Sequence, residues 1–124
     1  MAGLILVVDD EPFILRSLTF VLRKEGFEVI EARDGEEAMQ QIRTHHPVLV
    51  FLDVMMPKKN GYEVCEEVKS DPELADTFVI MLTAKGQESD RDKGLAMGAD
   101  EYMTKPFSPS KITERVREIL VPGV

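Results

Sequence analysis

The sequence has 124 residues, of which 44% are hydrophobic and 31% are charged, proportions that fit one globular domain. Its 15 Lys and Arg against 23 Asp and Glu give a net charge of −8, which argues against non-specific binding to nucleic acid or to an anionic membrane surface. No apolar run is long enough to span a bilayer, no signal-peptide pattern starts the chain, and the single cysteine, Cys65, cannot form an internal disulfide.

Short apolar runs alternate with helical patterns along the chain, which is typical of βαβ units. Continuous apolar runs at 4–8, 48–52 and 78–82 predict strands that are buried on both faces of a parallel sheet. Weaker runs at 28–32 and 101–104 predict strands near the edges of the sheet.

The segments between these runs predict five helices, the fourth of them spanning 87–97. Caps, first-turn prolines and helix-stopping residues predict where the helices begin and end. These residues are Pro12, Gly26, Asp34, either Asn60 or Gly61, Asp71, Gly98, Ser108 and Pro109. Strict alternation of strands and helices predicts an α/β fold: a single (βα)5 doubly wound domain, flavodoxin-like, with a five-stranded parallel sheet in the order 2-1-3-4-5.

In such a sheet, ligands bind at the carboxyl ends of the strands. Three acids, a hydroxyl and an ammonium follow the predicted strands: Asp9, Asp10, Asp53, Thr83 (before Ala84) and Lys105. Clustered carboxylates repel one another, and Mg²⁺ relieves this repulsion while leaving coordination positions for phosphate oxygens. A carboxylate can also attack phosphorus to form an aspartyl phosphate, with Mg²⁺, Lys105 and Thr83 neutralising the phosphoryl oxygens.

Each of these residues also has an ordinary explanation. Asp9 and Asp10 could cap the first helix, and Asp53 could be a turn residue. Thr83 could be a strand-end hydroxyl and Lys105 a solvated surface charge. Their joint occurrence at four strand ends favours the phosphoryl-transfer site.

Four segments resemble the receiver domain of response regulators in two-component signalling: 7–12 (VVDDEP), 53–64 (DVMMPKKNGYEV), 82–86 (LTAKG) and 98–107 (GADEYMTKPF). The resemblance covers essentially the whole chain, as one receiver domain at 1–124. It implies a cytoplasmic bacterial phosphoprotein in which Asp53 takes a phosphoryl group from a sensor histidine kinase or phosphotransfer protein. The partner downstream is an output protein or domain, with no direct contact to nucleic acid or membrane.

The resemblance also implies roles for single residues. Asp10, Asp53 and the backbone carbonyl of Met55 hold Mg²⁺ directly, with Mn²⁺ able to substitute, and Asp9 acts through water. Phosphoryl binding and switching fall to Lys105, Thr83, Ala84 and Tyr102, the Tyr102 ring moving inward so that the surface of helix 4, strand 5 and helix 5 changes. The Lys105–Pro106 bond is expected to be cis.

The stretch 83–109 most resembles receivers of the winged-helix OmpR/PhoB-type regulators, which dimerise on phosphorylation through that surface. The positions that fit this interaction face are Arg91, Leu95, Asp100, Glu101 and Arg115. Asp92 stands at a usually apolar position, and Lys111 stands where an acid usually pairs with Arg91. We therefore expect a homodimer that is weakened or rearranged. The end of the sequence at 121–124 fits either a stand-alone receiver or one cut from a longer regulator. The unusual residues at positions 92 and 111 favour a stand-alone receiver.

Two other classes of function compete with this interpretation. Aspartate-nucleophile phosphatases use similar residues but carry a second acid two positions after the nucleophile, where this chain has Met55. A phosphorylation-independent interaction module would be suspected if an acid or the lysine were missing. We therefore predict a signalling module that catalyses only its own phosphorylation and dephosphorylation. Since Met55 and Pro57 offer no group to position a water, self-hydrolysis should be moderate to slow.

Overall fold

Five parallel strands form the centre of the molecule in the order β2-β1-β3-β4-β5, which confirms the predicted order. The structure is a computed structural model that describes residues 3–54, 56, 58–84, 98–105 and 108–121. The strands are β1 (Leu4–Val8), β2 (Glu28–Ala32), β3 (Leu49–Asp53), β4 (Phe78–Ala84) and β5 (Glu101–Lys105). The weaker strand candidates, β2 and β5, are the two edge strands, as predicted.

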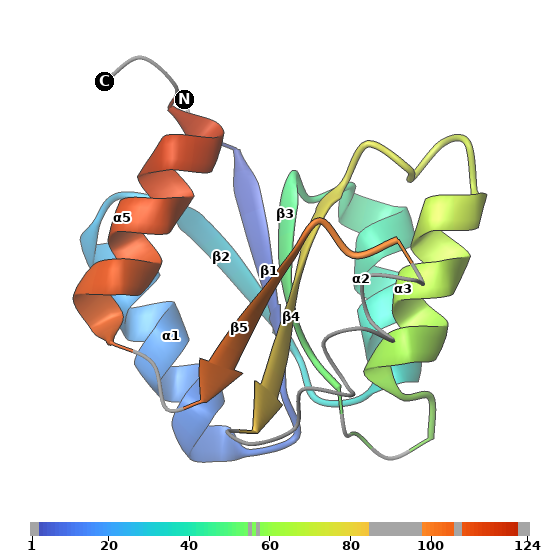
Figure 1. The fold of residues 1–124 in the computed structure, drawn as a ribbon, viewed down its shortest axis with the longest axis horizontal. Helices are drawn as coiled ribbons and strands as arrows, with labels where there is room; N and C mark the ends of the chain where they lie inside the picture. Colours follow the sequence, from blue (N-terminus) through green and yellow to red (C-terminus); the bar gives the residue numbers. More distant parts are fainter. Residues whose placement is uncertain (1–2, 55, 57, 85–97, 106–107, 122–124) are drawn as a thin grey trace.

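Four helices are described, two on each face of the sheet. They are α1 (Pro12–Lys24), α2 (Gly35–His45), α3 (Gly61–Ser70) and α5 (Pro109–Leu120). Figure 1 shows α1 and α5 on one face and α2 and α3 on the other, as a doubly wound sheet requires. The helix predicted at 87–97 lies outside the described residues. None of the described helices is long and apolar enough to cross a membrane.

Three strands differ from the prediction at their ends. β3 begins and ends one residue later than the apolar run 48–52, while β4 and β5 continue beyond their apolar runs. The parallel ladder explains the difference, because it pairs Asp53 with Leu82 and Ala84 with Lys105. Backbone pairing does not require an apolar side chain, so Asp53 and Lys105 are the last residues of their strands. The backbones of both residues are therefore paired within the sheet.

Side-chain caps begin α2 and α3. Asp34 Oδ1 accepts a hydrogen bond of 2.9 Å from the backbone N–H of Glu37, which confirms the predicted cap. Asn60, and not Gly61, caps α3: its side chain and that of Glu63 each accept a hydrogen bond of 3.0 Å from the other residue's backbone N–H. This reciprocal capping box fixes the first turn of α3.

The other two helices begin without a side-chain cap. α1 has Glu11 at its N-cap and Pro12 at its first position, and α5 has Ser108 and Pro109 in the same places. Ser108 is the N-cap of α5, as predicted, but its side chain makes no cap hydrogen bond, and its hydroxyl lies 2.9 Å from the hydroxyl of Ser110. The preset φ of proline helps to start both helices.

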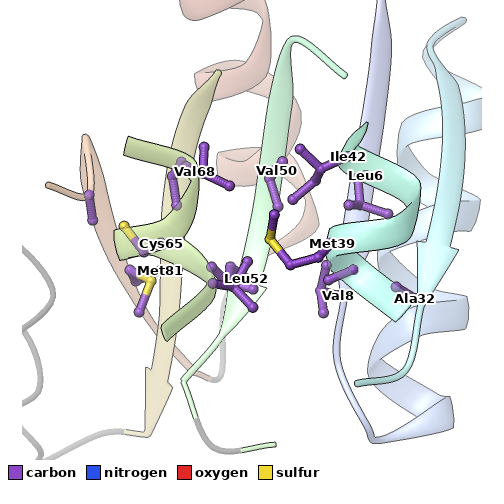
Figure 2. Close-up of a cluster of buried hydrophobic side chains, with 14 of the residues drawn as sticks. Leu6, Val8, Ala32, Met39, Ile42, Val50, Leu52, Cys65, Val68 and Met81 are labelled. Atoms are coloured by element: carbon purple, nitrogen blue, oxygen red, sulfur yellow. The ribbon is translucent and has the colours of Figure 1, made fainter. Parts of the chain in front are cut away.

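Alternate residues of the strands fill two hydrophobic cores. From β1, Leu6 and Val8 point toward α2 and α3, while Ile5 and Val7 point toward α1 and α5. Figure 2 shows the first of these cores, including Cys65 of α3. Burial raises the pKa of the Cys65 thiol to about 11, so this thiol is an inert part of the core at neutral pH.

Candidate functional site

Three carboxylates meet at the carboxyl ends of the two central strands. β1 and β3 are neighbours, with Val8 paired to Leu52, so the residues that end or follow these strands lie at the same edge. One carboxylate oxygen each from Asp9, Asp10 and Asp53 lies within 4.8 Å of the others. Asp9 and Asp53 are 0% and 6% exposed, whereas Asp10 is exposed. We call Asp9, Asp10, Asp53 and Lys105 the acidic rim.

Lys105 supplies the cation of the acidic rim from the edge strand β5. Its Nζ lies 2.8 Å from Asp9 Oδ2 and 3.3 Å from Asp53 Oδ1, so the side chain reaches past the end of β4. Burial disfavours the charged ammonium, but the carboxylates of Asp9 and Asp53 outweigh burial and raise the pKa of Lys105. Lys105 therefore stays protonated, and one ammonium faces three carboxyl groups.

The electrostatics of Asp53 show that one ammonium is not enough. Burial of the carboxyl and repulsion from the Asp9 carboxylate raise the pKa of Asp53 to about 7. Lys105 acts in the opposite direction, and Asp10 adds a smaller repulsion. Since an ordinary aspartate has a pKa of 3.8, the surroundings of Asp53 disfavour ionisation of its carboxyl group. A further cation at the acidic rim would remove this penalty.

The donor atoms fit a hard divalent cation. Asp9 Oδ1 accepts a hydrogen bond of 2.9 Å from the backbone N–H of Glu11, which fixes the orientation of the carboxylate. Asp9 Oδ2 is buried, and apart from its ion pair with Lys105 it has no hydrogen-bond partner among the described residues. Carboxylate oxygens gathered in this way are the ligands that Mg²⁺ prefers, so the residues present fit the expected metal.

Helix capping does not explain Asp9, the first of the two acids after β1. The N-cap of α1 is Glu11, which makes no side-chain cap hydrogen bond. Asp9 bonds to the N–H of Glu11 itself and not to an amide in the first turn. Its carboxylate is therefore directed to the acidic rim, where Lys105 also lies.

The expected switch residues lie on β4 and β5. Thr83 is buried at 2% exposure and follows Leu82, the residue that pairs with Asp53. Ala84 is the last residue of β4. Tyr102 is half-buried near the start of β5, paired with Met81. The sheet thus places Thr83 one residue after the partner of Asp53. Tyr102 lies on β5, two residues before Thr104, the residue that pairs with Thr83.

Several expected positions lie outside the described residues: Met55, Arg91, Asp92, Leu95 and Pro106. Of the rest of the expected interaction face, Lys111 is exposed on α5. Arg115 forms ion pairs with Glu101 and, at 3.3 Å, with Glu118 of its own chain. Two charges expected at a contact between chains are thus engaged within one chain.

Asp100 is also engaged within the chain, by a residue that sequence reasoning missed. Its Oδ2 accepts hydrogen bonds of 2.8 Å from Lys69 Nζ and from the backbone N–H of Val79. Lys69 Nζ also donates to the backbone carbonyls of Ala75 at 3.1 Å and Thr77 at 2.6 Å. No local pattern signals a pair of residues 31 positions apart, so only the folded chain shows it.

The fold agrees with comparisons with known proteins. The family model of the response regulator receiver domain matches residues 5–117, so the chain belongs to that family of signalling modules in two-component systems. It is 48% identical to the alkaline phosphatase synthesis transcriptional regulatory protein PhoP of Bacillus subtilis, over 94% of this chain and 48% of that protein. It is 42% identical to the phosphate regulon transcriptional regulatory protein PhoB of Escherichia coli, over 97% of this chain and 52% of that protein.

A solved structure agrees with these relatives. The signal receiver domain of a signal transduction histidine kinase from Syntrophus aciditrophicus has a TM-score of 0.89 and 32% identity, covering 98% of this chain and 92% of that one. The chain spans about half the length of the curated relatives PhoP and PhoB. The resemblance to receivers of OmpR/PhoB-type regulators is confirmed by these relatives.

Proposed function

We propose that residues 1–124 act as one receiver domain that is phosphorylated on Asp53 in a Mg²⁺-dependent reaction. The observation that supports this best is the acidic rim, where three carboxylates lie within 4.8 Å of one another beside one lysine ammonium. The raised pKa of Asp53 supports it too, because a site that lacks positive charge gains from a bound cation.

Each residue of the acidic rim has a part in this reaction. Asp10, Asp53 and the carbonyl of Met55 would hold Mg²⁺, which would neutralise charge on the phosphoryl oxygens, and Asp9 would act through water. An oxygen of Asp53 forms the bond to phosphorus while the bond from phosphorus to the leaving nitrogen or oxygen of the donor breaks. The ammonium of Lys105 balances charge on the phosphoryl group.

The donor and the output belong to the same proposal. We infer a sensor histidine kinase or phosphotransfer protein as donor, because the chain belongs to the receiver family. We infer an output protein or domain as the downstream partner, since the curated relatives are transcriptional regulators about twice as long as this chain. Movement of Thr83 and Tyr102 after phosphorylation would carry the signal to the surface of β5 and α5.

The test is phosphorylation by a small donor. Wild type and Asp53→Ala are incubated with acetyl phosphate and MgCl₂ and separated on a phosphate-affinity gel. We expect a shifted band for the wild type only, and none when EDTA replaces MgCl₂. Equal labelling of both proteins would overturn the assignment of Asp53. Turnover of other phosphoesters by the wild type would favour the phosphatase alternative.

Two finer proposals need separate measurements. We expect beryllofluoride-activated protein to show a weak or rearranged dimer in analytical ultracentrifugation, and a tight symmetric dimer through the β5 and α5 face would contradict this. We expect self-hydrolysis of the aspartyl phosphate to be moderate to slow, and a half-life of seconds at room temperature would contradict that.

A further inference from the structure

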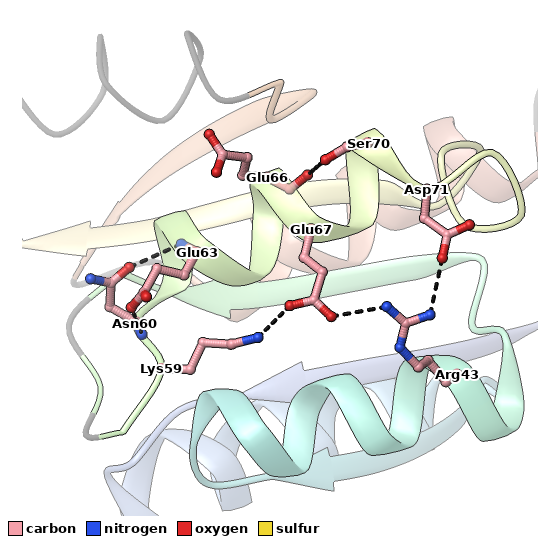
Figure 3. A network of polar contacts seen from close by, with 8 residues as sticks. All are labelled: Arg43, Lys59, Asn60, Glu63, Glu66, Glu67, Ser70 and Asp71. Carbon is pink, nitrogen blue, oxygen red and sulfur yellow. Dashed lines mark hydrogen bonds and ion pairs between the residues drawn. The ribbon is translucent and has the colours of Figure 1, made fainter.

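A network of ion pairs joins α2, α3 and the chain that leads into α3. Glu67 of α3 pairs through Oε1 with Lys59 Nζ and through Oε2, at 2.9 Å, with Arg43 Nη2 of α2. Arg43 Nη1 lies 3.0 Å from Asp71 Oδ2 at the end of α3. Figure 3 shows the carboxylate of Glu67 between the two cations. We call Arg43, Lys59, Glu67 and Asp71 the α2–α3 clasp.

The segment of Lys58 and Lys59 is also held by the start of α2. Lys58 Nζ lies 3.6 Å from Asp34 Oδ2, and Lys58 has a φ of 66°, in the left-handed region. Gly35 packs so closely on this segment that a Cβ there would overlap the carbonyl oxygen of Lys59. Lys58 and Lys59 are therefore held by side-chain ion pairs and by close backbone contact with the start of α2.

This segment leads directly to the backbone of Asp53. Lys59 precedes Asn60, the cap of α3, and Gly61 follows. The N–H of Gly61 donates a hydrogen bond of 3.0 Å to the carbonyl of Val54. A Cβ at Gly61 would overlap the carbonyl oxygen of Asp53. The position of Asp53 is therefore set partly by where Lys59, Asn60 and Gly61 are held.

We propose that the α2–α3 clasp positions Asp53 for binding of a divalent cation, with Glu67 as the positioning residue. This inference rests on the proposed function, since it concerns the affinity of the same acidic rim for Mg²⁺. Mg²⁺ accepts only near-octahedral geometry, so small displacements of a ligand lower its affinity. Lys59 and Glu67 have 31% and 33% exposed side chains, and ion pairs so exposed contribute little to stability. Cation affinity and stability can therefore be separated by experiment.

The experiment compares Glu67→Gln with Glu66→Gln as its matched control. Glu66 is the neighbouring carboxylate on α3 and is directed away from the clasp in Figure 3. Lys59→Met removes the cationic partner from a loop position, and Lys59→Arg keeps it. For each protein, the Mg²⁺ dissociation constant is measured by isothermal titration calorimetry, and the free energy of unfolding without metal by urea denaturation.

We expect Glu67→Gln and Lys59→Met to bind Mg²⁺ about five-fold more weakly than the wild type, as for residues that act on a site without touching it. Glu66→Gln and Lys59→Arg should stay within about two-fold of the wild type. The double variant Lys59→Met/Glu67→Gln should be no weaker than either single variant, because the two residues act as one unit.

The measurements distinguish a failure of this inference from a failure of the proposed function. If the wild type binds Mg²⁺ but Glu67→Gln and Lys59→Met bind it equally well, the clasp is only structural and the inference is overturned, while the proposed function stands. If Glu66→Gln weakens binding as much as Glu67→Gln, the effect is one of net charge and the inference is again overturned. If the wild type shows no saturable Mg²⁺ binding, the proposed function itself fails.

Discussion

The acidic rim and the α2–α3 clasp use the same chemical groups with opposite results. In the clasp, hydrogen bonds from Lys59 and Arg43 lower the pKa of Glu67, and two cations face two carboxylates. In the acidic rim, burial raises the pKa of Asp53 to about 7, and one cation faces three carboxyl groups. The difference shows that burial and the ratio of charges separate a site prepared for a cation from a surface network that is already neutralised.

The largest expected effect comes from removing the cation of the acidic rim. Lys105→Met leaves the buried Asp9 carboxylate without its partner at 2.8 Å, and we expect a loss of roughly 3 kcal/mol in the free energy of unfolding at pH 8. Arg43→Met, the matched change in the clasp, should cost much less, because exposed ion pairs contribute little to stability. Urea denaturation without metal measures both, and equal losses would remove the distinction between the two regions.

The second-largest expected effect is a gain in the free energy of unfolding, where the first is a loss. The folded-state pKa of Asp53 lies above the ordinary value of 3.8, so the folded protein binds more protons than the unfolded chain between these two values. The stability that depends on Asp53 therefore falls as the pH rises from about 4 to about 7. We expect Asp53→Asn to stabilise the metal-free protein by roughly 2 kcal/mol at pH 8 and little at pH 4. Urea denaturation at the two pH values tests this, and a destabilised variant at pH 8 would contradict it.

The third effect is stabilisation by metal. At ten times its dissociation constant, Mg²⁺ should raise the free energy of unfolding of the wild type by about 1.4 kcal/mol. Asp10→Asn should lose most of this gain but still fold, because Asp10 is exposed. Thermal unfolding with and without MgCl₂ measures the difference. A gain of the same size in Asp10→Asn would show that the cation binds elsewhere.

The smallest effect is expected in the clasp. Because the folded-state pKa of Glu67 is lowered, the stability that depends on it is present above the ordinary carboxyl pKa of 4.5 and is lost as the pH falls below that value. Glu67→Gln should therefore cost less than about 1 kcal/mol at pH 8, with the difference shrinking at acidic pH. If the loss of unfolding free energy in Glu67→Gln grew as the pH fell, the pKa of Glu67 would be raised and not lowered, and the contrast with Asp53 would disappear.

The sequence by itself determined the five strands, the four described helices and the edge of the sheet where the site lies. Continuous apolar runs located β1, β3 and β4, because strands buried on both faces need apolar residues throughout, and weaker runs located the edge strands β2 and β5. The topology then brought Asp9, Asp53 and Lys105 to one edge, since parallel strands end together. The prediction was less accurate at the strand ends of β3, β4 and β5, where backbone pairing continues through residues that are not apolar.

Only the tertiary structure decided the charge states and the long-range contacts. The pKa of Asp53 depends on burial and on the distances to Asp9 and Lys105, which no local pattern encodes. Arg43 and Glu67 are 24 residues apart, and their pairing requires that α2 and α3 lie on the same face of the sheet. Local patterns record the preferences of neighbouring residues, whereas electrostatic interactions depend on distances through space, which only the folded chain defines.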